Sequence, residues 1–333
     1  MTQKISLTGI KPSGTPHIGN YFGAIKPALE LVKTYDARYF IADYHALNTV
    51  KDPKLLEDQT YDLAATWLAC GLDPEQALLY RQSDIPETFE LTTNLMAFTA
   101  KGMMNRAHAY KANIALNQDA GKDQDLGINM GLYTYPVLMA ADILLFDTNL
   151  VPVGKDQKQH VEMTADIAQS VNHVYKQELL VIPEPLISEE TKIIKGLDGR
   201  KMSKSYNNVI PLFLPTKKFR KIIMKIVTNS QGVEEVKDPN NCSVFSFYKL
   251  FASDEQIKAL KNRYLAGGMG WGHAKQELFE VMEAHFSPMR EEYNKLIADR
   301  AFIDETLKKG AEKARIIAAN TLNRLRKATG IAR

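Results

Sequence analysis

The sequence predicts an α/β fold, a doubly wound parallel sheet followed by a smaller, all-helical C-terminal domain. Over the first 205 residues, short apolar segments alternate with segments whose apolar residues recur at helical spacing, which is typical of a parallel sheet with crossover helices. Strand patterns disappear after Thr216. We therefore expect a sheet domain over residues 1–205, a helical domain over 206–315, and a basic helix over 316–333 that packs back on the sheet domain.

The first predicted strand ends in a Gly/Pro-rich turn that opens a helix. Ile5 and Leu7 alternate with polar residues, and a helix follows from His17, with a kink expected at Pro27. Unpaired backbone N–H groups at such a helix start favour phosphate. His17 and Asn20 share one face of the first turn, where both can donate to phosphate oxygens. On these residues alone, a connecting turn that caps the helix is an equally good interpretation.

The next segments continue the alternation of strands and helices. Residues 38–42 are expected to form a buried strand that leads to His45, residues 55–70 a helix, residues 77–80 a third strand, and Pro86 starts another helix. Polar residues at the carboxyl end of a strand lie where α/β sheets bind ligands. His45 is therefore a candidate binding residue.

A later apolar helix carries one acidic residue. We expect this helix to begin at Pro136, so that Tyr135, Met139 and Asp142 fall on one face. A buried aspartate needs a hydrogen-bond donor. Asp142 therefore either makes a cap or structural hydrogen bond, or faces a ligand that brings one N–H.

Another strand is expected over residues 150–153, followed by Asp156 as the N-cap of a helix that places Gln157 at its N-terminus. His160 and Glu162 superficially resemble a deaminase zinc motif. The Cys-x-x-Cys that such a site requires is absent from the sequence, so we exclude it. Residues 179–183 are expected to form a further strand.

Two segments are expected to be mobile loops. Residues 117–131 are rich in Asp, Gly, Gln and Asn and could form a lid. Residues 192–205 are short, punctuated by glycine and strongly basic. Ammonium groups on such a loop can follow a pyrophosphate as charge develops on it. A solvated surface loop is the alternative.

The composition narrows the class of protein. The net charge of +3 is too small to indicate a nucleic-acid binder by itself. The two cysteines, Cys70 and Cys242, can form neither a disulfide framework nor a zinc site of paired cysteines. No signal peptide and no apolar run of about 18 residues is recognisable. We expect a cytoplasmic protein without a membrane span.

Two basic helices are expected in the C-terminal part of the chain. One helix gathers Lys217, Lys218, Arg220, Lys221 and Lys225. The last helix, expected over 316–328, has no acidic residue but carries Arg324, Arg326 and Lys327. A glycine-rich linker over 267–272 separates the helical stretches. Contact with an RNA backbone and a merely solvated basic face explain these patterns equally well.

Two short motifs together carry a resemblance to a known family. Residues 201–205 read Lys-Met-Ser-Lys-Ser and match the KMSKS signature of class I aminoacyl-tRNA synthetases, and residues 17–20 resemble the HIGH-type signature of that class. Within the class, the chain resembles the bacterial tryptophanyl-tRNA synthetases over essentially its whole length. Residues 9–14, 135–142 and 151–160 carry this closer resemblance.

The resemblance implies a Rossmann-like catalytic domain and a two-step reaction. The carboxylate of L-tryptophan attacks the α-phosphate of ATP, and a ribose hydroxyl of tRNA(Trp) then takes the acyl group. It further implies that Mg²⁺ is carried by ATP and not by protein side chains, that the helical domain binds the anticodon, and that the protein is a homodimer.

The resemblance also implies roles for individual residues. Asp142 would accept the indole N–H, Tyr135 and Gln157 would hold the ammonium group, and His45 would lie near the carboxylate of tryptophan. The residues expected to bind tryptophan are Gly9, His45, Tyr135, Met139, Asp142, Val153 and Gln157. Those expected to bind ATP are Lys11, Ser13, Gly14, His17, Gly19, Asn20, Lys111, Gly154, Asp156, Lys201, Met202, Ser203, Lys204 and Ser205. The catalytic residues expected among them are His17, Asn20, Lys201 and Lys204.

The sequence departs from familiar bacterial members of that family at three positions. Lys11 stands where they carry Gln, Lys155 stands where they carry an acid, and Asn113 stands where a second phosphate-contacting lysine is often found. Our hypothesis is that Lys11 supplies the charge that Asn113 lacks; a solvent-facing Lys11 is the alternative.

Three other functions remain open at this point. They are a synthetase for tyrosine, a small-molecule nucleotidyltransferase of the same superfamily, and a non-catalytic RNA-binding paralogue. The two intact signatures argue against the paralogue, and the long helical part after Thr216 argues against a small-molecule enzyme.

Overall fold

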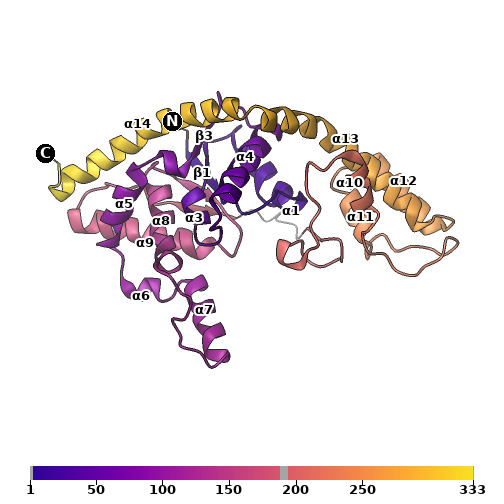
Figure 1. The fold of residues 1–333 in the computed structure, drawn as a ribbon, viewed down its shortest axis with the longest axis horizontal. Coiled ribbons are helices and arrows are strands. Elements are labelled where there is room, and N and C mark those ends of the chain that lie inside the picture. The colour runs from indigo at the N-terminus through magenta and orange to yellow at the C-terminus, as the bar shows by residue number, and fades with distance from the viewer. Residues whose placement is uncertain (1–2, 188–193, 333) are drawn as a thin grey trace.

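The computed structural model describes residues 3–187 and 194–332, and it contains a parallel five-stranded sheet in the order β3-β2-β1-β4-β5 (Figure 1). The register of the central pair runs from Ile5 opposite Asp36 to Ile10 opposite Ile41. The prediction of a parallel α/β sheet is confirmed. The strands are β1 (Ile5–Ile10), β2 (Asp36–Ile41), β3 (Leu78–Arg81), β4 (Leu150–Pro152) and β5 (Glu184–Leu186).

Helices connect and cover these strands. In the sheet region they are α1 (Ile18–Asn20), a π-helix (Tyr21–Ile25), α2 (Lys26–Leu31), α3 (Asp43–Ala46), α4 (Pro53–Ala69), α5 (Glu87–Met96), α6 (Lys101–Met104), α7 (His108–Asp119), α8 (Met130–Leu144) and α9 (Lys158–Tyr175). After the sheet come α10 (Thr216–Ile223), α11 (Ser243–Tyr248), α12 (Asp254–Ala266), α13 (Trp271–Ala298) and α14 (Arg300–Thr329). Short 3₁₀ turns occupy Gln82–Asp84 and Lys204–Tyr206.

The core has two parts, one on each face of the sheet. Side chains alternate along β2, so Tyr39 packs into the part that also holds Trp67, whereas Phe40 packs with Tyr80 and Phe146 on the other face. The first part continues without interruption into α10–α13. The helical region therefore shares its apolar core with one face of the sheet.

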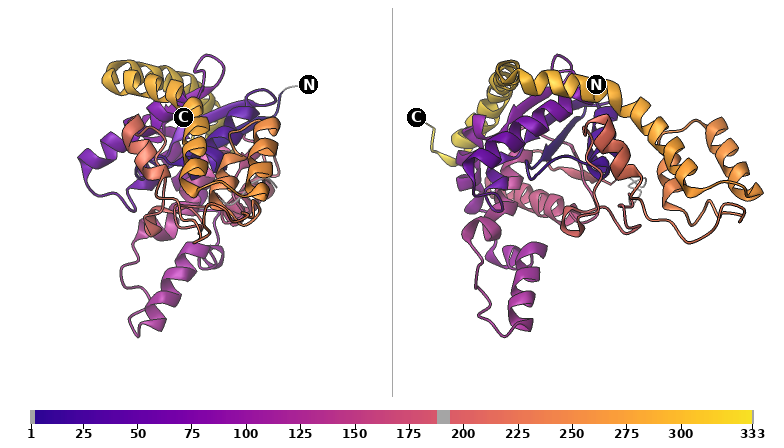
Figure 2. Two further views of the ribbon diagram at one scale, coloured as in Figure 1. Left: turned by 90° about the vertical axis from the view of Figure 1, so that its right-hand side faces the viewer. Right: turned by 45° about the vertical axis from the view of Figure 1, so that its right-hand side comes forward.

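The long helix α14 covers the edge strand β3. A Cβ atom at Gly310 would lie 1.9 Å from the carbonyl oxygen of Leu79, so only glycine permits this close approach. Figure 2 shows α13 and α14 running along the top of the molecule, from the helical region across the sheet. Unpaired strand edges invite aggregation, and α14 hides this one.

Ion pairs hold α14 against the sheet domain. Arg315 binds Glu87, Arg324 binds Asp147, and Arg326 binds Glu90. Arg324 and Arg326, which the sequence analysis considered for contact with RNA, therefore already bind carboxylates of the protein itself.

Several predicted element boundaries are wrong. The last helix begins at Arg300 and not at residue 316, because its apolar stripe continues back through Leu307 and Ile303. The strand expected over 179–183 lies instead at Glu184–Leu186, while Leu179 and Leu180 are buried in the core outside any strand.

Two helix starts were also misplaced. Pro136 lies inside α8, which begins at Met130 after the side chain of Asn129 accepts a hydrogen bond from the Leu132 N–H. The N-cap of α9 is Gln157 and not Asp156. Asp156 instead accepts a hydrogen bond from the side chain of Gln157.

The expected kink at Pro27 takes another form. A π-helix over Tyr21–Ile25 runs directly into α2, and Pro27 is the second residue of α2.

The expected lid is partly helical. Its first residues belong to α7, and turns follow until α8 begins. Figure 1 shows α6 and α7 projecting from the body of the molecule, and α7 buries none of its residues. Of the basic loop expected over 192–205, Lys192 and Ile193 lie outside the described residues. No helix in the described ranges is both long and apolar enough to span a membrane.

Candidate active site

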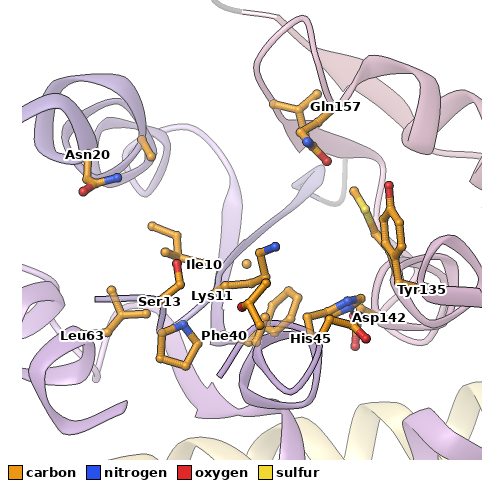
Figure 3. Close-up of a pocket in the computed structure, with 18 of the residues that line it drawn as sticks. Ile10, Lys11, Ser13, Asn20, Phe40, His45, Leu63, Tyr135, Asp142 and Gln157 are labelled. Atoms are coloured by element: carbon orange, nitrogen blue, oxygen red, sulfur yellow. Dashed lines mark hydrogen bonds and ion pairs between the residues drawn. The ribbon is translucent and has the colours of Figure 1, made fainter. Parts of the chain in front are cut away.

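A cavity of about 570 Å³ opens at the carboxyl ends of β1, β2 and β4 (Figure 3). The turn after β1 forms one wall, α8 and the end of β4 form the other, and Lys204 reaches it from the basic loop. The structure brings twelve of the predicted site residues to its wall. They are Gly9, Lys11, Ser13, Gly14, Asn20, His45, Tyr135, Met139, Asp142, Val153, Gln157 and Lys204.

Asp142 is buried at one end of this cavity and already has two donors from the protein. His45 Nε2 lies 2.8 Å from one carboxylate oxygen, and Gln82 Nε2 lies 2.8 and 2.9 Å from the two oxygens. Burial raises the pKa of Asp142, while the hydrogen bonds from His45 and Gln82 oppose that rise. Because a carboxylate offers about four acceptor positions, Asp142 can take one more hydrogen bond.

Gln82 was missed by the sequence analysis. It follows β3 and is almost fully buried, so the signal that could have found it is its place after a strand, the same signal that selected His45.

A second chain of hydrogen bonds runs along the same wall, from Tyr135 on α8 to Gln157 at the start of α9. The Tyr135 hydroxyl lies 2.5 Å from His160 Nε2, and His160 Nδ1 lies 3.0 Å from Gln157 Oε1. Gln157 Nε2 donates to Asp156, so its Oε1 must accept the proton of His160 Nδ1. Nε2 is then the acceptor, and the Tyr135 hydroxyl donates to it.

Burial lowers the pKa of His160, with the charge of His108 acting in the same direction. The ring is therefore neutral at pH 7, as this pattern of hydrogen bonds requires. The oxygens of Tyr135 and Gln157 keep acceptor capacity toward the cavity, which suits a cationic group. His160 is a further residue that the sequence analysis did not assign to the site.

The two signature motifs are tied together by backbone hydrogen bonds. The Ile18 N–H donates to the Ile210 carbonyl at 3.0 Å, and the Leu212 N–H donates to the Pro16 carbonyl at 3.2 Å. The segment that follows the basic loop therefore pairs with the turn that follows β1. Lys204 Nζ adds a hydrogen bond of 2.7 Å to the Ser13 carbonyl.

Gly14 allows Lys204 to reach this turn. Its φ of 95° lies in the left-handed region, and a Cβ atom there would lie 3.0 Å from Lys204 Nζ. Any other residue would be strained in the backbone and would meet the lysine.

His17 is buried beside the cavity and does not line it. Burial, with the charge of Lys204 as a second cause, lowers the pKa of His17 to about 4. Its Nδ1 atom is buried without a hydrogen-bond partner in the described part of the chain. The backbone N–H of His17 donates to Asn20 Oδ1 at 3.1 Å, which fixes the first turn of the helix.

The remaining predicted residues lie away from the cavity wall. Met202 is buried in the apolar core, and Lys201 pairs through its backbone with Lys195. Lys111 is exposed on α7. The predicted ATP-binding residues that do not line the cavity are His17, Gly19, Lys111, Gly154, Asp156, Lys201, Met202, Ser203 and Ser205.

Lys11 lines the cavity, and Figure 3 shows its side chain extending toward the middle. Asn113 does not line it, since its amide donates to the Ala109 carbonyl within α7 at 2.9 Å. Residues 3–187 and 194–332 contain no group of three or more His, Cys, Asp or Glu side chains that could hold a metal ion.

Comparison with known proteins extends this picture. A family model described as tRNA synthetases class I (W and Y) matches residues 2–287. A tryptophan–tRNA ligase from Pseudomonas aeruginosa is 50% identical over 335 residues, which cover 99% of this chain and 74% of that protein. A tryptophan–tRNA ligase from Bordetella parapertussis is 51% identical over 98% of this chain and 72% of its own length.

Among solved structures, the tryptophanyl-tRNA synthetase from Campylobacter jejuni complexed with ADP and tryptophan is 43% identical. It superposes with a TM-score of 0.91 and covers 98% of this chain and 99% of its own. The family model matches most of the residues, and relatives of this identity cover nearly the whole chain. The chain therefore belongs to the class I tRNA synthetases of the W and Y type.

Proposed function

We propose that the protein is a tryptophan–tRNA ligase, which activates L-tryptophan with ATP to tryptophanyl-adenylate and transfers the amino acid to tRNA(Trp). The observation that carries this proposal is a single cavity with a buried carboxylate, Asp142, at one end, Lys204 bonded to the turn at Ser13, and Lys11 extending toward the middle between them. The names of its relatives and the bound molecules of the Campylobacter structure support the same reaction.

The end of the cavity near Asp142 selects the amino acid. The indole N–H donates to the acceptor position that His45 and Gln82 leave open on Asp142. Met139 and Val153 line the wall beside the ring. An amino acid without a side-chain N–H would leave that buried acceptor position unpaired, which is costly.

Tyr135 and Gln157 hold the ammonium group of the substrate. Tyr135 donates its proton to His160, and Gln157 accepts one from His160, so both oxygens present lone pairs to the cavity. An ammonium group has three donors and no acceptor. The hydrogen-bond pattern therefore fits an amino acid held by its charged nitrogen.

The lysine end binds MgATP as a substrate. The backbone of the turn at Ser13 and Gly14 and the start of the following helix lie beside Lys11 and Lys204. The carboxylate of tryptophan attacks the α-phosphorus, the bond to pyrophosphate breaks, and the lysines stabilise the negative charge that leaves. No side-chain nucleophile is required, so catalysis rests on positioning and electrostatics.

The tRNA is expected to contact the helical domain, which we assign to the anticodon. Lys217, Lys218, Lys221 and Lys225 are exposed and form no ion pair with any described residue. Unlike the arginines of α14, they are available to phosphate groups. Mutating them to Gln should raise the KM for tRNA without changing tryptophan-dependent exchange.

We also propose a homodimer, acting in the cytoplasm. Met96, Leu116, Leu126 and Met130 are exposed apolar side chains near the projecting α6–α7 segment, which suits burial against a second copy. Sedimentation should give twice the chain mass. A stable, active monomer would contradict this proposal.

Amino-acid-dependent exchange between ATP and pyrophosphate, measured for all amino acids, tests the proposed function. Tryptophan alone should support exchange at a high rate, followed by transfer to tRNA(Trp). Exchange with tyrosine would identify a tyrosine enzyme. Exchange with another carboxylic acid, or no exchange, would point to a different nucleotidyltransferase or an RNA-binding protein.

A further inference from the structure

The turn that follows β3 is tied to the start of α3 by hydrogen bonds onto one carboxylate. Asp43, the first residue of α3, accepts the Ser83 N–H at 3.0 Å and the Tyr44 N–H at 3.1 Å on its Oδ1 atom. The Ser83 hydroxyl donates to its Oδ2 atom. Neither Asp43 nor Ser83 lines the cavity. The carboxylate therefore joins the chain that follows β2 to the chain that follows β3 from behind the cavity wall.

This link decides which way the amide of Gln82 points. The Tyr44 N–H also donates to Gln82 Oε1 at 3.1 Å. Because a backbone N–H can only donate, the end of the amide that faces it must be the oxygen, and the other end is the nitrogen. The nitrogen faces Asp142, at 2.8 and 2.9 Å from its two oxygens. Gln82 is 1% exposed, so bulk water offers its amide no other partner.

The direction of this amide matters for the chemistry of Asp142. An amide nitrogen donates and stabilises the ionised carboxylate, whereas an amide oxygen in the same place would repel the carboxylate and favour its neutral form. A neutral carboxyl group is a weaker acceptor than a carboxylate. Burial raises the pKa of Asp142, and the hydrogen bonds from His45 and Gln82 lower it. Under the proposed function, selection of an indole N–H therefore depends on the direction in which Gln82 is held.

We propose that Asp43 is a positioning residue for the choice of amino acid, which holds the turn after β3 so that the nitrogen of Gln82, and not its oxygen, faces Asp142. This inference rests on the proposed function of Asp142 as the acceptor of the indole N–H. Asp43 acts through the backbone of Tyr44 and through Gln82. Loss of its carboxylate frees the turn, and the amide of Gln82 can then reverse.

Substitution of Asp43 tests this chain of contacts. Asp43→Ala removes the acceptor of both Ser83 donors, so the KM for tryptophan in the exchange reaction should rise about three- to tenfold, as expected for the loss of one hydrogen bond. The KM for ATP should not change. Asp52→Ala is the matched control, because Asp52 accepts the Lys54 and Leu55 N–H groups at the start of α4, away from the cavity. It should leave the KM for tryptophan unchanged.

Two substitutions of Gln82 should give opposite pH profiles. Gln82→Met removes the donor, so the pKa of Asp142 rises, and the KM for tryptophan should increase as the pH falls from about 8 to about 6. Gln82→Glu keeps an oxygen toward Tyr44 but sets a second carboxyl group against Asp142. The two carboxyl groups then share one proton, and the KM should increase as the pH rises and this proton is lost. A residue that only supports the fold would not reverse the slope.

The other titratable groups near Asp142 are the same in both variants. His45 from α3 and the phenol of Tyr80 from β3 face Asp142, and Tyr135 lies on the same helix. Burial raises the pKa of Tyr80 and of Tyr135, so both phenols stay neutral in this range of pH. A difference in slope between Gln82→Met and Gln82→Glu therefore reports on residue 82.

A double mutant tests whether Asp43 acts through Gln82. In a Gln82→Met background, Asp43→Ala should no longer raise the KM for tryptophan. An equal increase in both backgrounds, an unchanged KM in Asp43→Ala alone, or parallel pH profiles of the two Gln82 variants would overturn the inference. If Asp43→Ala does not fold, Ser83→Ala replaces it, with a smaller increase that must also depend on Gln82.

The inference and the proposed function can fail separately. Tryptophan-dependent exchange by the unmodified protein tests the function. The pKa of Asp142 can be followed without substrate by NMR of protein labelled with carbon-13 in its aspartate carboxyl groups, with the signal assigned through Asp142→Asn. This pKa should rise in Gln82→Met and in Asp43→Ala, but not in Asp52→Ala. A pKa of Asp142 that does not respond to Asp43→Ala would overturn the inference whatever the substrate is.

Discussion

The two ends of the cavity are built in different ways. At the tryptophan end, Asp142, His45 and Gln82 are buried and bonded to one another before any ligand contributes. At the phosphate end, Lys11 and Lys204 are exposed, and the bond of Lys204 is to a backbone carbonyl of the turn. Under the proposed function, selection of the amino acid depends on a fixed network, whereas catalysis depends on cations that can move to the charge as it develops.

The largest effect is expected at the fixed end. Asp142→Ala removes the acceptor that we propose for the indole N–H, so the preference for tryptophan over phenylalanine in kcat/KM should fall by about 10³-fold or more. Exchange assays with both amino acids measure this change. Gln82→Leu serves as a comparison, because it removes one donor to Asp142 but leaves the carboxylate, and it should lose less selectivity. A preference that survives Asp142→Ala would show that the selective group lies elsewhere.

The next effect is expected at the mobile end. Lys204→Ala should lower the rate of adenylate formation by about 10²- to 10³-fold and leave tryptophan binding nearly unchanged, because the ammonium acts on charge that appears in the transition state. Stopped-flow measurement of adenylate formation and equilibrium binding of tryptophan separate the two. Equal losses in the rate of adenylate formation and in the affinity for tryptophan would indicate a structural role for the loop. The contrast between the two ends of the cavity would then be wrong.

Substitution of Lys11 tests whether a lysine at this position supplies the charge that Asn113 lacks. A charge-assisted hydrogen bond is worth about 1.5–3 kcal/mol, so Lys11→Gln should weaken the use of ATP by about tenfold or more. Asn113→Lys, added to it, should restore much of the loss. A double-mutant cycle on kcat and on the KM for ATP measures the coupling. Additive effects, or a neutral Lys11→Gln, would rule out the compensation.

The smallest effect is expected in the pH dependence of the stability of the folded protein. His17 has its pKa lowered from 6.5 to about 4, so the unfolded chain takes up a proton between pH 6.5 and 4 that the native protein does not. Stability therefore decreases as the pH falls through this window. The melting temperature should drop over this range, and by less in His17→Asn than in the unmodified protein. Identical pH dependence in both would mean that His17 is not held neutral in the native protein.

The sequence predicted the sheet and most of the cavity wall because both follow from local patterns. Short apolar segments placed β1 to β4 within a few residues, and helical spacing put Tyr135, Met139 and Asp142 on one face. The position of Gln82 after β3 could have found it, although its partner Asp142 lies 60 positions away. His160 offered no such signal, since its importance lies in a hydrogen bond to Tyr135, 25 positions away.

The two basic helices show a further limit of local patterns. In the sequence α10 and the end of α14 look alike. In the structure, the arginines of α14 bind Glu87, Asp147 and Glu90 from distant segments, whereas four lysines in and after α10 have no such partners among the described residues. A pattern of charge does not reveal whether tertiary structure has already neutralised it.

The position of α14 has a consequence for synthesis of the protein. Strand β3, at residues 78–81, is covered by residues that the ribosome adds more than 200 positions later, around Gly310. During translation, the β3 edge of the sheet therefore stays exposed until α14 has been synthesised. A chaperone or another nascent chain can bind to this edge in the meantime. We expect chains shortened before Arg300 to aggregate, although they contain every strand and every residue of the cavity wall.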